Sequence, residues 1–422
     1  MKKLFLLGAC LLAASSLFAG GGSQKSDASS GGVTTIEFFQ QKMEEGPQRG
    51  YQAVVDRFNA EYAGKYKVEM NTVPDAGRVL TSRVVAGDIP PLFSDYPTQL
   101  QFKEKVANGY IMDLTGQSFM SRVNPPALDM SKAPDGRDYA MPLSHNFMGV
   151  YYNIDIFNKY GLTVPNTYAE FIAACKKLKD NGVLPIVFSY QNVGRVGHMF
   201  QAMNVAWTVN GVEKFVNVMN KKGQVVGDPV FQRLAEKMTE VTSFGNADAF
   251  SVPDTAMWET FANGGAAMCI TGSYARGTIL LANPNLKMGV FPIPNDTVPT
   301  TTLLTGIDAA LCVSARATPA QKEAALAFLE FLSRTPNGQT FCDADGAPSC
   351  LTAVVYKDDG LGPITAKMQA GPLWDWMGSF IPTTIVNEMY SVTQQFLLDK
   401  NAGNYLSDLQ NVIVTGAEQA GL

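Results

Sequence analysis

The chain has 422 residues, of which 46% are hydrophobic, 17% charged and 10% aromatic, and its formal net charge is −5. That length predicts two or three domains, and 38 Gly and 23 Pro, near ordinary usage, exclude a collagen-like or broadly disordered chain. The acidic balance argues against a nucleic-acid binder, which needs a basic surface. The only two histidines, His145 and His198, exclude a histidine-rich metal centre.

The first 19 residues have the pattern of a cleaved signal peptide. Two lysines precede an apolar run at 4–18, and Ala19 ends the run before a segment of small residues. The run is too short for a membrane-spanning helix, which needs about 20 apolar residues. Two processing routes fit the sequence: cleavage after Ala19, which we favour because it leaves an apolar region of normal length, or lipidation at Cys10 in the stretch LGAC.

Residues 20–32 (GGGSQKSDASSGG) are polar and rich in Gly and Ser, which is typical of a flexible linker. A tether directly after a signal peptide is the one membrane association that we expect. The interpretation is therefore an exported protein, periplasmic or held at the extracytoplasmic face of a membrane.

The chain then alternates short apolar strands with amphipathic helices. The sequence predicts a strand at 34–39, a helix at 51–62 with its apolar side chains on one face, a strand at 67–73 and a short buried strand at 92–94. This strand–helix–strand start favours an α/β fold with a parallel sheet.

Two later helices begin with recognisable capping signals. Thr167 and Glu170 form the spacing of a capping box, and Thr318 with Gln321 repeats it, with a proline at the first helical position. The last 40 residues are predicted to be mostly helical. Further buried strands are expected at 184–188, 266–270, 288–291 and 309–313.

Five cysteines follow the signal region, and none forms a CxxC motif. Cys175, Cys269 and Cys312 lie in apolar runs and are expected to be small buried side chains. Cys342 and Cys350 bracket the turn-rich segment DADGAPS. In an oxidising compartment these two either close a short disulfide loop or remain free thiols.

The segment 141–189 resembles the middle of the family 1 extracellular solute-binding proteins, which are related to maltodextrin-binding protein. The resemblance is carried by Pro142, the run Tyr151-Tyr152-Asn153, Phe157, Gly161-Leu162 and the capped helix that begins after Thr167.

Other segments resemble the same family in the same order. The run AGDIPP at 86–91 is similar to AG-x-x-PD, with Pro91 replacing the Asp, and 109–114 is similar to G-x-(I/L)-x-D-L. The segment 261–274 is similar to F-x-x-G-x-A-A-M-x-x-x-G-S-W, with Tyr274 at the Trp. The run FPIP at 291–294, Gly306 and the helix at 320–332 complete a resemblance that covers nearly all of 33–422.

The resemblance implies a two-lobe periplasmic binding protein of the type II kind, with hinge strands that cross between α/β lobes. It places lobe one at 33–145 plus 303–346 and lobe two at 147–300 plus 350–422. It also implies a monomer that captures a sugar or oligosaccharide by lobe closure and docks on the permease subunits of an ABC importer. No cofactor, metal or catalysis is implied.

Binding a sugar needs flat ring faces and a set of hydrogen-bonding side chains. Tyr274, whose family counterpart stacks on the sugar, is the first candidate; the alternative is a ring packed under the next helix. Trp374 and Trp376 alternate in GPLWDWMGS, so that one is expected to face the ligand, or they only cap the lobe. Among the other candidates, Gln41, Asp95 and Tyr96 follow predicted strands. His145, Asn146, Gly306 and Asp308 lie near the expected crossings between lobes, and Arg276 follows Tyr274. For each of them the alternative is a solvated loop residue or a helix cap.

Two other classes of function remain open on sequence. A binding protein for another small polar solute, such as a polyamine or iron, would share the fold. A secreted glycan-active enzyme needs paired acids at no fixed spacing, although the motifs GxSxG, HExxH and GK[ST] are absent from the sequence.

Overall fold

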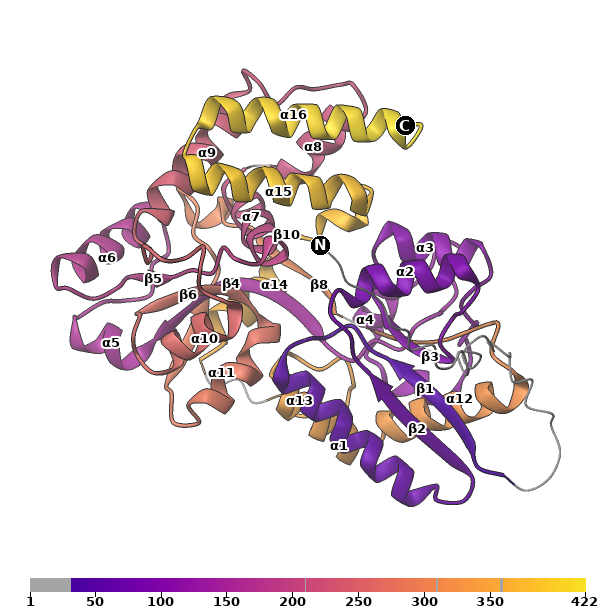
Figure 1. Cartoon of the computed structure of the whole chain (residues 1–422). Coiled ribbons are helices and arrows are strands. Elements are labelled where there is room, and N and C mark those ends of the chain that lie inside the picture. The colour runs from indigo at the N-terminus through magenta and orange to yellow at the C-terminus, as the bar shows by residue number, and fades with distance from the viewer. Residues whose placement is uncertain (1–31, 209, 309, 357–359) are drawn as a thin grey trace, which may run out of the picture.

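The structure is a computed structural model that describes residues 32–422 except 209, 309 and 357–359 (Figure 1). The predicted signal peptide, Cys10 and nearly all of the linker at 20–32 lie outside the described residues. Within the described part of the chain, no helix is both long enough and apolar enough to span a membrane.

Two separate hydrophobic cores divide the protein into two lobes, which lie side by side in Figure 1. The first core draws on residues between Ile36 and Leu143 and between Ile307 and Leu351. The second draws on residues between Phe147 and Leu304 and between Leu361 and Ala417. The chain therefore passes from one core to the other three times, and we propose the lobe boundaries at these crossings.

These crossings differ slightly from the boundaries expected from the resemblance. Leu303 and Leu304 pack in the second core, whereas Cys350 and Leu351 pack in the first. We therefore propose to assign 303–304 to lobe two and 350–351 to lobe one.

Lobe one is built on a four-stranded sheet in the order β2-β1-β3-β9. The expected strand at 34–39 is confirmed as β1, and it pairs in parallel with β2 and β3, while β9 is antiparallel to β3. The strands are β1 (Thr34–Phe39), β2 (Tyr66–Asn71), β3 (Leu92–Asp95) and β9 (Ala310–Val313). The helices of this lobe are α1 (Glu45–Glu61), α2 (Ala76–Ala86), α3 (Leu100–Ala107), α4 (Pro125–Ser131), α12 (Pro319–Ser333), α13 (Thr335–Asp345) and the 3₁₀ turn η1 (Ser118–Arg122).

Lobe two has a mixed sheet in the order β10-β8-β4-β6-β5, and β7 also pairs with β4. The strands are β4 (His145–Asn153), β5 (Ile186–Val187), β6 (Met268–Gly272), β7 (Met288–Phe291), β8 (Leu303–Ile307) and β10 (Leu373–Trp374). Its helices are α5 (Ile154–Lys159), α6 (Tyr168–Asp180), α7 (Val193–Trp207), α8 (Gly211–Met219), α9 (Pro229–Thr242), α10 (Asp254–Ala262), α11 (Arg276–Ala282), α14 (Gly362–Ala370), α15 (Thr383–Asp399) and α16 (Ala402–Gln419), with 3₁₀ turns η2 (Ser273–Ala275), η3 (Val298–Thr300) and η4 (Met377–Ser379).

The capping signals predicted from the sequence are confirmed, but one strand prediction needs correction. Both capping boxes form, at Thr167 before α6 and at Thr318 before α12. The strand expected at 184–188 pairs only over two residues of β5. The expectation that the last 40 residues are mostly helical is confirmed. They form two helices, because Lys400 takes a left-handed conformation and the Asn401 side chain then caps α16.

Strands β4 and β8 form the hinge between the lobes. They pair antiparallel with His145 opposite Ile307 and Asn146 opposite Gly306. The Thr305 hydroxyl also donates to the Asn146 carbonyl over 2.6 Å. Since β4 runs from the first core into the second and β8 runs back at this register, rotation of one lobe against the other must bend this pair.

All five cysteines described by the structure are buried and free. Cys342 lies near the Ala347 carbonyl, 3.6 Å from sulfur to oxygen. This arrangement corresponds to the free-thiol alternative for Cys342 and Cys350.

A close backbone contact joins the lobes where α1, α11 and α13 meet. A Cβ added at Gly277 in lobe two would lie 2.0 Å from the Ala344 carbonyl oxygen in lobe one, and a Cβ added at Gly46 would lie 2.5 Å from the same oxygen. A Cβ added at Gly346 would lie 2.8 Å from the Gly277 nitrogen. Only glycines fit here, so the observed closeness of the lobes depends on them.

Replacing Gly277 by Ala is expected to push the lobes apart at this contact. Overpacking costs about 1–3 kcal/mol, so small-angle X-ray scattering should give a larger radius of gyration for Gly277→Ala. Gly403→Ala is the matched control, because the nearest atom to its added Cβ is 3.5 Å away. A Gly277→Ala variant as compact as the Gly403→Ala variant would contradict this role of the contact.

Candidate functional site

A buried ionic cluster lies at the edge of lobe one that faces the hinge. Lys42, which follows β1, is only 3% exposed, and its Nζ contacts the carboxylates of Asp308 and, at 2.6 Å, Asp345. Burial opposes the charge of Lys42, but the two carboxylates outweigh it and hold the Lys42 pKa well above its usual value. Burial and the nearby charge of Asp308 raise the pKa of Asp345.

A second ionic cluster joins the two lobes directly. Arg195 on α7 of lobe two contacts Glu44, which precedes α1 of lobe one, with 2.5 Å between Nη2 and Oε1. Its Nε also contacts Asp254 at 2.9 Å. Burial works against both charges, yet the attraction outweighs it, so the Glu44 pKa is lowered and the Arg195 pKa is raised. The two groups therefore stay ionised at neutral pH.

The ring of Tyr274 packs against the arginine of this inter-lobe ion pair. The Arg195 guanidinium carbon is 4.5 Å from the centre of the Tyr274 ring, an arrangement that favours a cation against a ring face. The Tyr274 hydroxyl lies 3.2 Å from His198 Nδ1 and 3.6 Å from the Met148 sulfur. The ring is 6% exposed, and its orientation is fixed from two sides.

Trp376 completes the aromatic part of the site. Its ring packs edge-on against His198, with 4.9 Å between ring centres, and its indole N–H donates to Asn146 Oδ1 over 2.7 Å. The loop approaches the hinge closely because Gly306 has no side chain: a Cβ there would lie 2.5 Å from Asp375 Oδ1. Burial raises the pKa of Asp375, whose carboxylate also accepts from the Ser379 hydroxyl.

Both histidines of the chain lie at this site, and both are held neutral. Burial and the adjacent positive charge of Arg195 lower the His198 pKa to about 3. Burial also lowers the His145 pKa, although the charge of Asp308 partly opposes it. A neutral imidazole can both donate and accept a hydrogen bond, which suits recognition of hydroxyl groups.

The structure brings together most of the binding residues expected from the sequence. Tyr274 and Trp376 approach His198 from two sides, Asn146 and Gly306 contact the Trp376 loop, and Asp308 contacts Lys42 as described above. Burial and the charges of Asp308 and Glu44 raise the pKa of Tyr96, which places that hydroxyl near the same groups. These residues remain our proposal for the ligand site.

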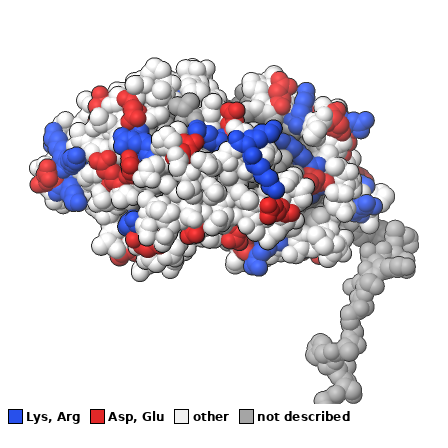
Figure 2. All heavy atoms as spheres, turned by 90° about the horizontal axis from the view of Figure 1, so that it is seen from above, with Lys and Arg blue, Asp and Glu red and all other residues white. Residues whose placement is uncertain are grey.

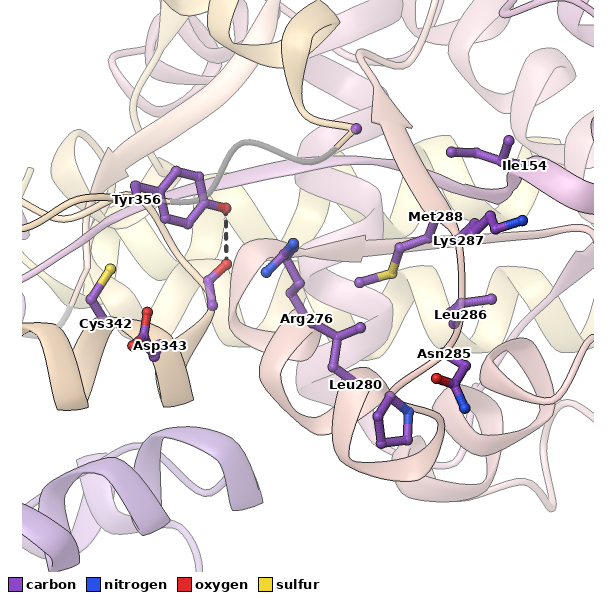
Figure 3. A pocket seen from close by; sticks show the side chains of 13 residues that line it. Ile154, Arg276, Leu280, Asn285, Leu286, Lys287, Met288, Cys342, Asp343 and Tyr356 are labelled. Atoms are coloured by element: carbon purple, nitrogen blue, oxygen red, sulfur yellow. Dashed lines mark hydrogen bonds between the residues drawn. The ribbon is translucent and has the colours of Figure 1, made fainter.

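Four expected residues make other contacts. Asp95 is fully buried in lobe one and paired with Lys105 at 2.7 Å. Gln41 makes two hydrogen bonds to Ser94. Its backbone N–H donates to the Ser94 hydroxyl over 2.8 Å, and its side-chain amide donates to the Ser94 carbonyl over 2.6 Å. Trp374 is half-buried against Phe380, with 5.6 Å between ring centres. Arg276 lines a separate cavity (Figure 3).

Sequence reasoning missed Glu44, Arg195 and Asp345. Glu44 is one of two adjacent acids before a helix, and Arg195 is a single charge in the helix VGRVGHMF. Neither pattern distinguishes a buried partner from a solvated one. A charged residue within a run that is otherwise apolar and rich in glycine was the available signal for Arg195.

Among the described residues, no group of three or more His, Cys, Asp or Glu is placed to hold a metal ion. The site instead offers ring faces, an amide and neutral imidazoles between two lobes, and the nearby Lys42 and Arg195 each contact two carboxylates. Such a site can hold a polar, uncharged molecule with apolar faces. On the face drawn in Figure 2, acidic and basic side chains are interspersed over both lobes.

Comparison with known proteins assigns the family. The model of the bacterial extracellular solute-binding proteins matches residues 53–374. The chain is 27% identical over 375 residues to the multiple sugar-binding protein of Streptococcus mutans, with 87% of each protein covered. It is 22% identical over 327 residues to the melibiose/raffinose/stachyose-binding protein MelE of Bacillus subtilis, covering 72% of this chain and 74% of MelE.

Solved structures agree on the fold. The structure of the solute-binding protein RafE in complex with raffinose superposes with a TM-score of 0.81 at 23% identity, covering 90% of this chain and 99% of RafE. The protein therefore belongs to the bacterial extracellular solute-binding family and has its two-lobe α/β fold.

The ion pair between Glu44 and Arg195 is expected to hold the lobes together. Glu44→Gln leaves a buried guanidinium short of one partner, and breaking such a pair costs about 3–5 kcal/mol. Scattering should therefore show a larger radius of gyration for Glu44→Gln than for the wild type. Lys214→Gln is the control, since Lys214 pairs with Asp228 within lobe two. Equal radii for the wild type and Glu44→Gln would contradict the inter-lobe role.

The neutral histidines predict a loss of stability in mild acid. Their pKa values are lower in the folded than in the unfolded protein, so their contribution is complete above about pH 6.5 and is lost as the pH falls below it. Each should contribute a slope of up to about 1.4 kcal/mol per pH unit. Urea unfolding between pH 7.5 and 5 should therefore show a shallower decline for His198→Gln. Parallel pH profiles for the variant and the wild type would refute this effect.

Proposed function

We propose that this protein captures a sugar or oligosaccharide outside the cytoplasm and delivers it to an ABC importer. The single observation that carries the proposal is the aromatic cluster of lobe two beside the hinge, where Tyr274 and Trp376 both pack against His198 and Trp376 also donates to Asn146. Ligand entry requires the lobes to separate, and closure then buries the ligand on both sides.

The chemistry of these groups suits a neutral ligand rich in hydroxyls. A sugar ring has apolar C–H faces that pack on aromatic rings, while its hydroxyls need both donors and acceptors. Asn146 and the neutral His198 supply both types. Because an unpaired buried polar group costs about 1–3 kcal/mol, a fixed set of partners selects one hydroxyl pattern over another.

The charges near the site argue against the other solutes. Glu44, Asp308 and Asp345 are buried and each contacts Lys42 or Arg195, so they are poorly placed to bind the ammonium groups of a polyamine. Because Lys42 and Arg195 each already pair with two carboxylates, neither is available to bind the carboxylate of a sugar acid. Iron would require a cluster of ligands that the described residues do not provide.

The names of relatives support the same class of ligand. The Streptococcus mutans relative is named a multiple sugar-binding protein, and the RafE structure contains raffinose. We further propose that the protein acts as an exported monomer, tethered or free, whose closed form docks on a pair of permease subunits. It binds its ligand without chemical change.

A ligand screen tests the proposal. Raffinose, melibiose, stachyose and monosaccharides should include at least one that raises the melting temperature, whereas spermidine and ferric citrate should not. The bound sugar should be recovered intact, without release of new reducing ends. A shift with spermidine or iron and with none of the sugars would overturn the assignment.

Tyr274→Ala should weaken binding of that sugar by at least about 1 kcal/mol, or roughly fivefold, the scale of one aromatic contact. Isothermal titration calorimetry measures the difference. Trp374→Ala is the matched control, because Trp374 packs against Phe380. Unchanged affinity in Tyr274→Ala would remove this ring from the site.

A further inference from the structure

A second space between the lobes lies away from the Tyr274 ring. This cavity has a volume of about 780 Å³, within the range of small-molecule sites. Lobe two supplies Arg276, α11 and the start of β7, and lobe one supplies the end of α13 (Figure 3). Tyr356 and Gly360, on the chain that returns to lobe two, also line the cavity.

The close contact of Gly277 with Ala344 separates this cavity from the site at Tyr274. Gly277 follows Arg276 directly, and Ala344 lies two residues after Cys342, so the backbone contact borders the cavity itself. Tyr274 and Arg276 are two residues apart in the chain, but only Arg276 lines this cavity. Arg276, expected from the sequence to bind the sugar, therefore belongs to another site.

Arg276 is the central polar group of the cavity. Its side chain projects between the Tyr356 side and the Leu280–Met288 side (Figure 3). Its guanidinium carbon lies 6.0 Å from the centre of the Tyr356 ring. No carboxylate of the described residues lies within ion-pair distance of Arg276, and its buried Nε has no hydrogen-bond partner.

A second unsatisfied donor is close to Arg276. The Tyr151 hydroxyl is fully buried and has no hydrogen-bond partner among the described residues. Burial is the main cause that raises the Tyr151 pKa, and the electrostatic effect of Tyr356 adds to it. The charge of Arg276 opposes this rise. Tyr151 does not itself line the cavity, so of these two buried donors a ligand acceptor would offset the cost at Arg276.

The cavity wall carries two other charged groups. Lys287 lies 3.5 Å from Asp155, whereas Asp343 accepts a hydrogen bond from the neutral Gln339 amide over 2.8 Å and has no cationic partner among the described residues. Of the two described cations that line the cavity, Arg276 is the one without a carboxylate within ion-pair distance in the described part of the chain. A ligand carboxylate would supply that partner.

The remaining walls suit an apolar body and no covalent chemistry. Leu280, Leu286 and Met288 line one side of the cavity. On the other side, burial raises the pKa of the Cys342 thiol to about 12, which keeps it protonated and unreactive at neutral pH.

We propose that this cavity is a second ligand site that takes a small organic anion, a carboxylate carried on an apolar body. Arg276 binds the carboxylate through its two-pronged guanidinium, and the leucine and methionine side chains cover the apolar part. The inference does not rest on the identity of the ligand held at Tyr274.

Benzoate is the probe, and benzyl alcohol is its uncharged counterpart. Calorimetry should detect benzoate binding to the full protein and at least tenfold weaker binding of benzyl alcohol. Arg276→Gln should weaken benzoate at least tenfold, whereas Arg233→Gln, an exposed arginine on α9, should leave it unchanged. Leu280→Ala shortens a partly exposed side chain of the apolar wall and should weaken benzoate severalfold, which tests the site should Arg276→Gln fail to fold.

Three results would overturn the proposal. The first is the absence of benzoate binding to the wild-type protein at about 10 mM benzoate, which is tenfold above a dissociation constant of about 1 mM. The second is equal affinity of the wild type and Arg276→Gln. The third is loss of benzoate binding in Tyr274→Ala but not in Arg276→Gln, which would place the anion at the first site.

Discussion

The ion pair between Glu44 and Arg195 is the interaction on which the inter-lobe arrangement depends. Each partner comes from a different lobe, both are largely withdrawn from water, and each would be costly to leave unpaired. The pair also supports Tyr274, because the guanidinium lies against the ring. A change in the position of the Tyr274 ring is therefore linked to the distance between the lobes. Such a link allows the closure of the lobes to respond to the ligand.

Burial and ion pairing explain how a site rich in ionised groups can serve an uncharged molecule. Lys42 and Arg195 are each surrounded by carboxylates, and burial keeps both histidines neutral. The groups that remain for a ligand are ring faces, an amide and imidazole nitrogens. The ionic clusters thus fix the shape of the site, and the neutral groups supply its selectivity. Arg276 differs because its charge has no such counterpart, which is why we assign it a separate role.

The sequence predicted local structure and family better than it predicted contacts. The capping boxes at Thr167 and Thr318 and the strand at 34–39 depend on neighbouring residues and were confirmed. Tyr274 was expected at the ligand site from its family counterpart, Trp376 from the alternation in its loop, and Asn146 from its place near a predicted crossing. Tyr274 and Trp376 both pack against His198, and Trp376 contacts Asn146. Glu44 and Arg195 are 151 residues apart, and nothing local reveals a pair that only the closing of two lobes creates.

A crystal structure of the protein grown with raffinose tests the central claim most directly. The account predicts that the sugar lies between the lobes, with one ring face on Tyr274 or Trp376 and its hydroxyls within hydrogen-bond distance of Asn146 or His198. A sugar bound on the outside of one lobe, with the Tyr274 and Trp376 rings still packed as in the present structure, would contradict it.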